Sequence, residues 1–125
     1  MRFESREIES YAEPVLANEL REGEVYFAVN FGDQQLLIPF VEPKVFIGRN
    51  LDQGDTDLLF FQSFESYAAG IRYNPNADND PAAFDVRGPE DLKHIFEYEK
   101  ALDRLLECSL RRRGVRERKR ELLKS

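Results

Sequence analysis

The chain has 125 residues, a length that suits one domain, and its ten phenylalanines and five tyrosines supply apolar material for a core. The single cysteine excludes an intramolecular disulfide framework, and no apolar run approaches the roughly 20 residues needed to cross a bilayer. Glutamates stand near the start, where a signal peptide needs an apolar stretch, so we expect a cytoplasmic protein without membrane insertion.

The net charge of −6 is unevenly distributed. Residues 1–110 contain 10 Lys and Arg against 22 Asp and Glu, a net charge of −12. Residues 111–125 contain 8 Lys and Arg against 2 Asp and Glu, a net charge of +6. An acidic body repels phosphate backbones, so we expect any nucleic acid to bind only through the basic end.

The first predicted elements are an arm and a hairpin. Residues 1–18 have weak helical character, and we expect a loosely committed arm. Apolar residues occupy the odd positions from Val25 to Phe31, which predicts a strand with one face on a core and the other toward solvent. After a short turn, residues 36–41 read as the returning strand, where Pro39 favours an edge position or a bulge.

Two further strands are expected in the middle of the chain. The Glu42-Pro43 pair is expected to break the chain before a third strand over residues 45–47. The apolar run at residues 58–61 predicts a fourth strand that is covered on both faces.

A short and a long helix complete the pattern. Ser63 is placed to cap a helix over residues 64–69, which Gly70 ends, and residues 74–82 have the composition of a loop. A proline at its first position and acidic residues in its first turn predict a long amphipathic helix over residues 89–113. Its apolar stripe consists of Leu92, Ile95, Phe96, Leu102, Leu106 and Leu110.

Together these elements predict an α+β fold. An antiparallel meander of about four strands, within residues 24–62, is packed by the long helix over residues 89–113. A small bent barrel of the same strands is the alternative. Residues 1–110 form a single domain in this interpretation, and residues 111–125 form a basic helical extension or tail.

The basic segment is the strongest local signal for binding. Its cations are suited to an acidic protein surface, to a second copy of the chain or to nucleic-acid phosphates. Aromatic residues are not interleaved with them, which argues against stacking on single-stranded bases. The candidate anion- or partner-binding residues are Arg111, Arg112, Arg113, Arg116, Arg118, Lys119 and Arg120.

A second candidate site lies on the predicted long helix. Glu99 and Asp103 fall within its apolar stripe on a helical wheel, where a carboxylate would be partly desolvated and would need a partner. With His94 and Tyr98 they form a possible pocket between helix and sheet.

The sequence contains no recognisable catalytic, metal or cofactor motif. One histidine and one cysteine cannot supply a zinc site. The oxygen-rich loop that starts at Asn74 departs from the calcium pattern, because Asn79 stands where a glycine is required. The Gly-rich loop of phosphate-binding proteins is missing too, and we expect no cofactor.

We therefore favour a non-catalytic protein-interaction or regulatory domain with an acidic body and a basic tail. Its partner is expected to be a protein, a second copy of the chain included. The first alternative is a small-ligand binder or an enzyme with a pocket between helix and sheet. The second is an accessory protein that binds nucleic acid through the tail.

Overall fold

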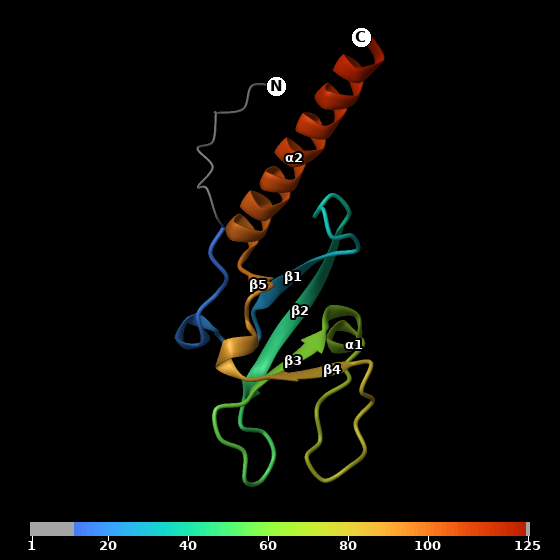
Figure 1. Ribbon diagram of the computed structural model, residues 1–125. Helices are drawn as coiled ribbons and strands as arrows, with labels where there is room; N and C mark the ends of the chain where they lie inside the picture. Colours follow the sequence, from blue (N-terminus) through green and yellow to red (C-terminus); the bar gives the residue numbers. More distant parts are fainter. Residues whose placement is uncertain (1–11, 125) are drawn as a thin grey trace, which may run out of the picture.

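A computed structural model describes residues 12–124, which form one antiparallel sheet and one long helix (Figure 1). The sheet is open, with five strands in the spatial order β4-β3-β2-β1-β5, so the predicted α+β class is confirmed and the barrel alternative is not adopted. No helix in this part of the chain is both long and apolar enough to cross a membrane. The elements are η1 (Ala17–Glu19), β1 (Val25–Phe31), β2 (Pro39–Arg49), β3 (Leu59–Ser63), α1 (Phe64–Ala68), β4 (Phe84–Arg87), η2 (Pro89–Asp91), β5 (Ile95–Phe96) and α2 (Tyr98–Lys124).

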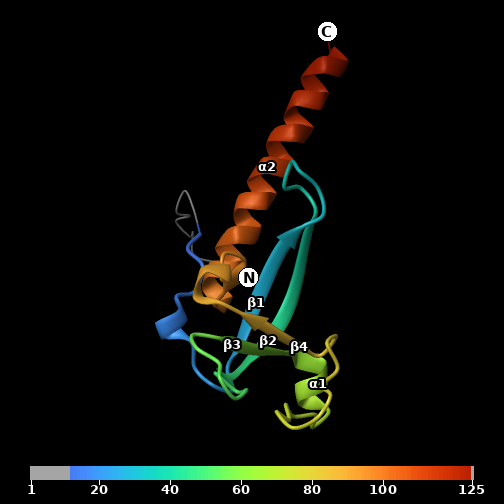
Figure 2. The same ribbon diagram turned by 60° about the horizontal axis from the view of Figure 1, so that its bottom comes forward.

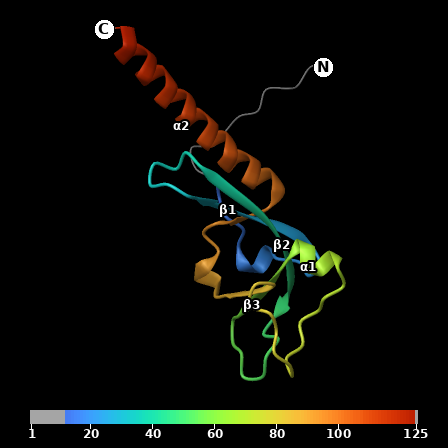
Figure 3. The same ribbon diagram turned by 90° about the vertical axis from the view of Figure 1, so that its right-hand side faces the viewer.

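The helix α2 is in contact with the sheet through its first half. Its first turns pack against β1 and β5, and its remainder runs past the β1–β2 hairpin and away from the body (Figures 2 and 3). The helix has 27 residues and is therefore about 40 Å long. It extends well beyond the sheet that anchors it.

Apolar side chains fill both faces of β1, which lies between β2 and β5, so the predicted solvent face is wrong for Tyr26 and Ala28. Tyr26 and Ala28 belong to the larger core, which the segment before β1 covers. Val29 belongs to a second core beneath α2. The larger core comprises Val15, Leu20, Tyr26, Ala28, Phe46, Leu59, Phe61, Leu92 and Ile95. The second comprises Ala12, Val29, Phe96 and Ala101, with Phe27, Phe31 and Leu105 packed against it.

The predicted arm is partly placed by these contacts. Residues 1–11 lie outside the described part of the chain. Ala12 and Val15 are buried, and the Val15 amide donates a hydrogen bond to the Ile95 carbonyl at 2.9 Å. The segment from residue 12 onward is thus joined to the sheet.

The second and third predicted strands are one continuous strand, β2, and the break expected at Pro43 is absent. The reason is the direction in which the strand's polar groups point. The Phe46 amide donates to the Glu24 carbonyl, and the Ile38 carbonyl accepts from the Gly32 amide, so even-numbered residues bond to the β1 side. Odd-numbered prolines therefore face the other side of β2, where β3 begins to pair only at Lys44. There a missing amide hydrogen loses no ladder bond.

The long helix begins at Tyr98, nine residues after the predicted start at Pro89. Pro89 opens only a short 3-10 turn, and Ile95–Phe96 pairs with Ala28 and Phe27 as an edge strand. The apolar residues that resembled the first turns of a helix are buried in the sheet and the two cores. Their spacing fits both interpretations, and the pairing with β1 decides between them.

The edge strand β4 was not predicted, whereas the neighbouring elements were. β4 pairs with β3, whose first four residues are fully buried, as expected for a strand covered on both faces. The short helix α1 follows with Ser63 as its cap, and Gly70 ends it with a φ of 88°. The Gln62 amide nitrogen donates to the Ile71 carbonyl at 2.7 Å, which holds the chain that leaves α1 against β3.

Candidate functional site

The beginning of α2 is fixed to the body by buried side chains and by one long-range hydrogen bond. Ala101 and Cys108 are buried, and Leu105 packs between them on the same face. The Glu107 carboxylate accepts a hydrogen bond from the Ala12 amide at 2.7 Å. Glu107 also accepts one from the Arg104 guanidinium at 2.9 Å. These contacts set the direction in which the rest of the helix leaves the body.

Two arginines then fasten the helix to the tip of the β1–β2 hairpin. Arg111 donates to the Leu36 carbonyl from Nε at 3.0 Å and from Nη2 at 2.9 Å, and Arg112 donates to the Leu37 carbonyl at 2.8 Å. The Arg111 guanidinium also lies 5.3 Å from the centre of the Phe31 ring, within the range of a cation–π contact. Leu36 has a φ of 59°, a conformation that side chains rarely adopt, and the arginine bonds help to hold it there.

Beyond this clamp, Gly114 and Val115 are half-buried beside the hairpin tip, and every residue from 116 to 124 is exposed in the described part of the chain. Within the described part of the chain, no hydrogen bond or ion pair engages five of its basic side chains, all of which are exposed. We call them the exposed basic set: Arg113, Arg116, Arg118, Lys119 and Arg120. Apolar residues share this end of the helix, since Leu122 is 75% and Leu123 is 88% exposed.

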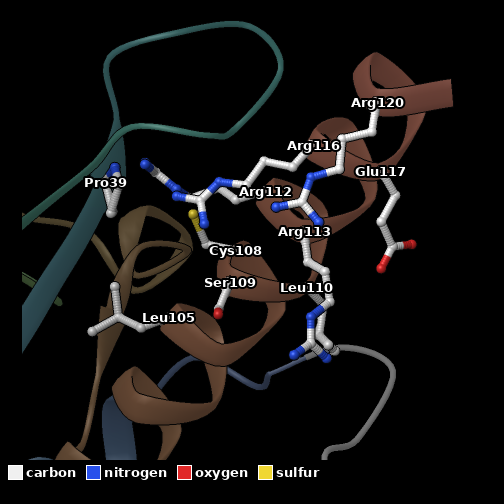
Figure 4. Close-up of a pocket in the computed structure, with 10 residues that line it drawn as sticks. All are labelled: Pro39, Leu105, Cys108, Ser109, Leu110, Arg112, Arg113, Arg116, Glu117 and Arg120. Atoms are coloured by element: carbon white, nitrogen blue, oxygen red, sulfur yellow. The ribbon is translucent and has the colours of Figure 1, made fainter. Parts of the chain in front are cut away.

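A groove runs along one side of this end of α2 (Figure 4). Four arginines line it within an arc of about 100° of the helix surface: Arg112, Arg113, Arg116 and Arg120. The side chains of Arg112 and Arg116 extend from the helix toward Pro39 of β2, which stands on the other side of the groove (Figure 4). Glu117 also lines the groove, so its charged residues are four arginines and one glutamate, a net positive charge.

A second groove, of about 990 Å³, lies on another side of the same helix end. It lies between the hairpin tip, at Gln35 and Leu37, and the helix surface around Gly114 and Val115. Arg111, Arg118 and Lys119 also line this groove. The groove therefore has an apolar floor and a basic rim.

The structure therefore divides the predicted basic residues into two groups. Arg111 and Arg112 bond to carbonyls of the hairpin loop, and their role is at least partly to hold the helix. The exposed basic set stands clear of the body. The sequence shows a run of basic residues. It does not show which of them bond to the hairpin, because those bonds join positions 75 residues apart.

The four residues of the second candidate site lie on the first turns of α2 and just before it. Asp103 is 6% exposed and so is buried, as expected, whereas Glu99 and His94 are exposed and Tyr98 is 61% exposed. His94 precedes α2 and does not share it with the other three. The Tyr98 ring meets Phe27 edge to face at 5.7 Å, which gives it a packing contact. None of the four lines either groove of α2.

His94 has a perturbed ionisation. Partial burial of its ring, together with the positive charges of Arg104, Arg87 and Lys93, lowers the pKa of His94 below its ordinary value of 6.5. Its backbone carbonyl accepts a hydrogen bond from the Val29 amide at 2.9 Å. The residue thus helps to place β5 beside β1.

Two other ionisable groups have structural partners away from α2. Lys44 and Arg87 both bond to the Asp85 carboxylate, at 3.1 and 2.6 Å. Although partial burial opposes it, these two cations hold the pKa of Asp85 below 3.8. The hydrogen bond from Tyr73 to Asp52 at 2.6 Å raises the pKa of that tyrosine to about 12.

Within residues 12–124, no group of three or more His, Cys, Asp or Glu side chains is arranged to hold a metal ion. Comparison of the chain with family models, with curated proteins and with solved structures yields no match. Both grooves described above lie along the second half of α2, where the exposed basic set stands.

Proposed function

We propose that the protein is a non-catalytic interaction domain whose recognition element is the projecting end of α2. One observation carries the proposal: the exposed basic set stands on a helix that the sheet anchors at its base and whose described residues from 116 to 124 are all exposed. Folding contacts do not account for five cations at this place. A binding role does.

The division of charge supports an anionic partner. Residues 1–110 carry a net charge of −12 and residues 111–125 one of +6, so the helix end is the basic part of an acidic molecule. A partner with negative charge is attracted to this end and repelled by the body, which orients its approach. Raising the salt concentration should therefore slow association.

A pocket-based activity has less support. Tyr98 and Glu99 are exposed, His94 precedes the helix, and none of the four candidate residues lines either groove of α2. Binding of nucleic-acid phosphates by the exposed basic set has the support of its charge, and the experiment below distinguishes it from binding of a protein.

The experiment is a pull-down from a lysate of the source organism with three full-length proteins. The wild type is compared with a variant in which all five residues of the exposed basic set are glutamine, and with one in which all five are lysine. Glutamine and lysine are both good helix formers, so helix content is matched while charge differs. Bound protein is identified by mass spectrometry, and bound nucleic acid by its loss after nuclease treatment.

We expect a defined protein partner with the wild type and the lysine variant, and its loss with the glutamine variant. Equal capture by the glutamine variant would place recognition elsewhere in the molecule. Material that disappears with nuclease treatment would make this a nucleic-acid-binding protein, and capture of nothing by any of the three would remove the interaction role.

A further inference from the structure

An apolar seam continues from the body into the projecting end of α2. Ala101, Cys108, Val115 and Leu122 follow one another at intervals of seven residues. Residues at this spacing lie on nearly the same side of a helix, with a drift of about 20° per step. Ala101 and Cys108 are buried in the body, whereas Val115 is half-buried and Leu122 is 75% exposed. The seam that packs on the sheet at its start thus lacks cover from the body at its end.

A seven-residue apolar repeat is the pattern by which one helix packs lengthwise on another. The second groove fits such a partner, because Gly114 has no side chain and leaves the helix surface low beside Val115. A glycine inside a helix lowers helix stability by roughly 1 kcal/mol relative to alanine. The position of Gly114 in the floor of the groove allows another helix to approach α2 closely.

The residues around Val115 indicate the charge of the partner. Its neighbours on the helix surface, three and four residues away in each direction, are all basic. They are Arg111, Arg112, Arg118 and Lys119. These four residues form two basic rows, one on each side of Val115. A helix that covers the seam must bring acidic side chains against both rows.

Other occupants fit these observations less well. The α2 helix of a second copy would place the same basic side chains against each other, and like charges that flank a helix–helix seam disfavour pairing. Nucleic acid would bond to the arginines through its phosphates but would leave Val115 and Leu122 without apolar contacts. An acidic amphipathic helix satisfies both the charge and the apolar seam.

We propose that the projecting end of α2 pairs with an acidic amphipathic helix of another protein, whose apolar residues cover Val115 and Leu122 and whose carboxylates face the basic rows. This inference rests on the proposed function and specifies the partner of the same site. It makes α2 one half of a two-helix interface, held at a fixed angle by the contacts of Arg111 and Arg112 with the hairpin.

A synthetic peptide provides the test. The probe has four heptads, with leucine at the first position and glutamate at the fourth and fifth positions of each, and alanine elsewhere. A shuffled peptide of the same composition keeps the net charge and the helix propensity, but its leucines and glutamates are scattered around the helix and form no stripe. Binding to full-length protein is measured by fluorescence anisotropy at about 50 mM and 200 mM salt, alongside a 20-base-pair DNA duplex.

Three variants and two matched controls localise the binding. The double variant Val115→Ala/Leu122→Ala removes the seam, and Leu123→Ala is its control on an adjacent face, about 100° away. The double variant Arg118→Glu/Lys119→Glu reverses the rim, and Arg21→Glu/Lys93→Glu makes the same change in net charge on exposed residues of the body. The third variant is the five-fold glutamine protein used above.

We expect the heptad peptide to bind at least tenfold more tightly than the shuffled one, and both double variants of α2 to weaken it at least tenfold. The Leu123 and body controls should bind within about twofold of the wild type. Equal affinity for the two peptides would overturn the helix-pairing inference while leaving a charge-based interaction domain intact. Tighter binding of the duplex, or self-association of the protein that the seam variant abolishes, would replace the acidic helix by nucleic acid or by a second copy.

Discussion

Replacing Arg111 with alanine removes the guanidinium that fastens α2 to the β1–β2 hairpin. The change deletes two hydrogen bonds to the Leu36 carbonyl and one contact with the Phe31 ring. A hydrogen bond with a charged donor contributes about 1.5–3 kcal/mol, and a cation–π contact at an exposed site about 0.5–1 kcal/mol. Arg111 and Leu36 are only half-buried, and water can replace part of what is lost. We therefore expect the free energy of unfolding to fall by about 1–2 kcal/mol.

Arg113→Ala is the matched control for this measurement. The same substitution is made in the same helix, two residues away, at a side chain that is exposed and has no hydrogen bond within residues 12–124. We expect its free energy of unfolding to stay within about 0.5 kcal/mol of the wild type. The chain has no tryptophan, so urea unfolding is followed by far-ultraviolet circular dichroism. A midpoint for Arg111→Ala that matches that of Arg113→Ala would refute the clamp.

Three further predictions concern the body. The chain has a single histidine, so an NMR titration should give one imidazole midpoint, below 6.5; a midpoint above that value would contradict the stated environment of His94. Because the folded pKa of His94 is depressed, the stability that depends on its neutral form is fully present above pH 6.5 and decreases as the pH falls from 6.5 to the folded pKa. The substitution His94→Gln should abolish this decrease. Asp85→Asn should lower the free energy of unfolding by about 1 kcal/mol at neutral pH. Because the folded pKa of Asp85 is depressed, this contribution is present above the unfolded value near 3.8 and is lost as the pH falls through the folded pKa. A cost in urea titrations that stays constant as the pH falls below 3.8 would argue against it. Gly48→Ala should lower the free energy of unfolding by about 1–3 kcal/mol. Gly48 has a φ of 147° at the irregularity in β2, and an added Cβ would lie 3.0 Å from the Leu51 side chain. An unchanged melting temperature would show that this strain is absent.

Local patterns were sufficient for several elements. The alternation from Val25 to Phe31 predicts that β1 is a strand, although not that both of its faces are buried. The Ser63 cap with Gly70 predicts α1, whose capping contacts lie within a few residues. The α+β class follows from these elements and the long helix. Each is a case in which propensity and packing favour the same structure.

The errors arise where distant contacts decide. Leu92, Ile95 and Phe96 fit a helical stripe, but pairing of Ile95–Phe96 with β1 makes them part of the sheet and delays α2 until Tyr98. Pro43 suggests a break, but its ring lies on the side of β2 where no ladder bond is needed. Neither outcome can be derived from neighbours in sequence, because each depends on which strand lies alongside.

The candidate site shows the same division. The positive charge of residues 111–125 is visible in the sequence. The clamp of Arg111 and Arg112 on the hairpin is not, and neither is the emergence of the seam at Val115. The seven-residue spacing of the seam was present in the sequence, but it gains meaning only once Cys108 is known to be buried and Leu122 exposed.

Photo-crosslinking in cells of the source organism tests the central claim most directly. A photoreactive amino acid is placed at Val115 on the seam and, in a separate protein, at Ile71, an exposed residue beside α1 on the body. We predict that the probe at Val115 captures a discrete protein, that the captured peptide is an acidic amphipathic helix, and that the probe at Ile71 does not capture it. Capture of a protein from Ile71 and none from Val115 would contradict the account, because recognition would then belong to the body and not to the projecting end of α2.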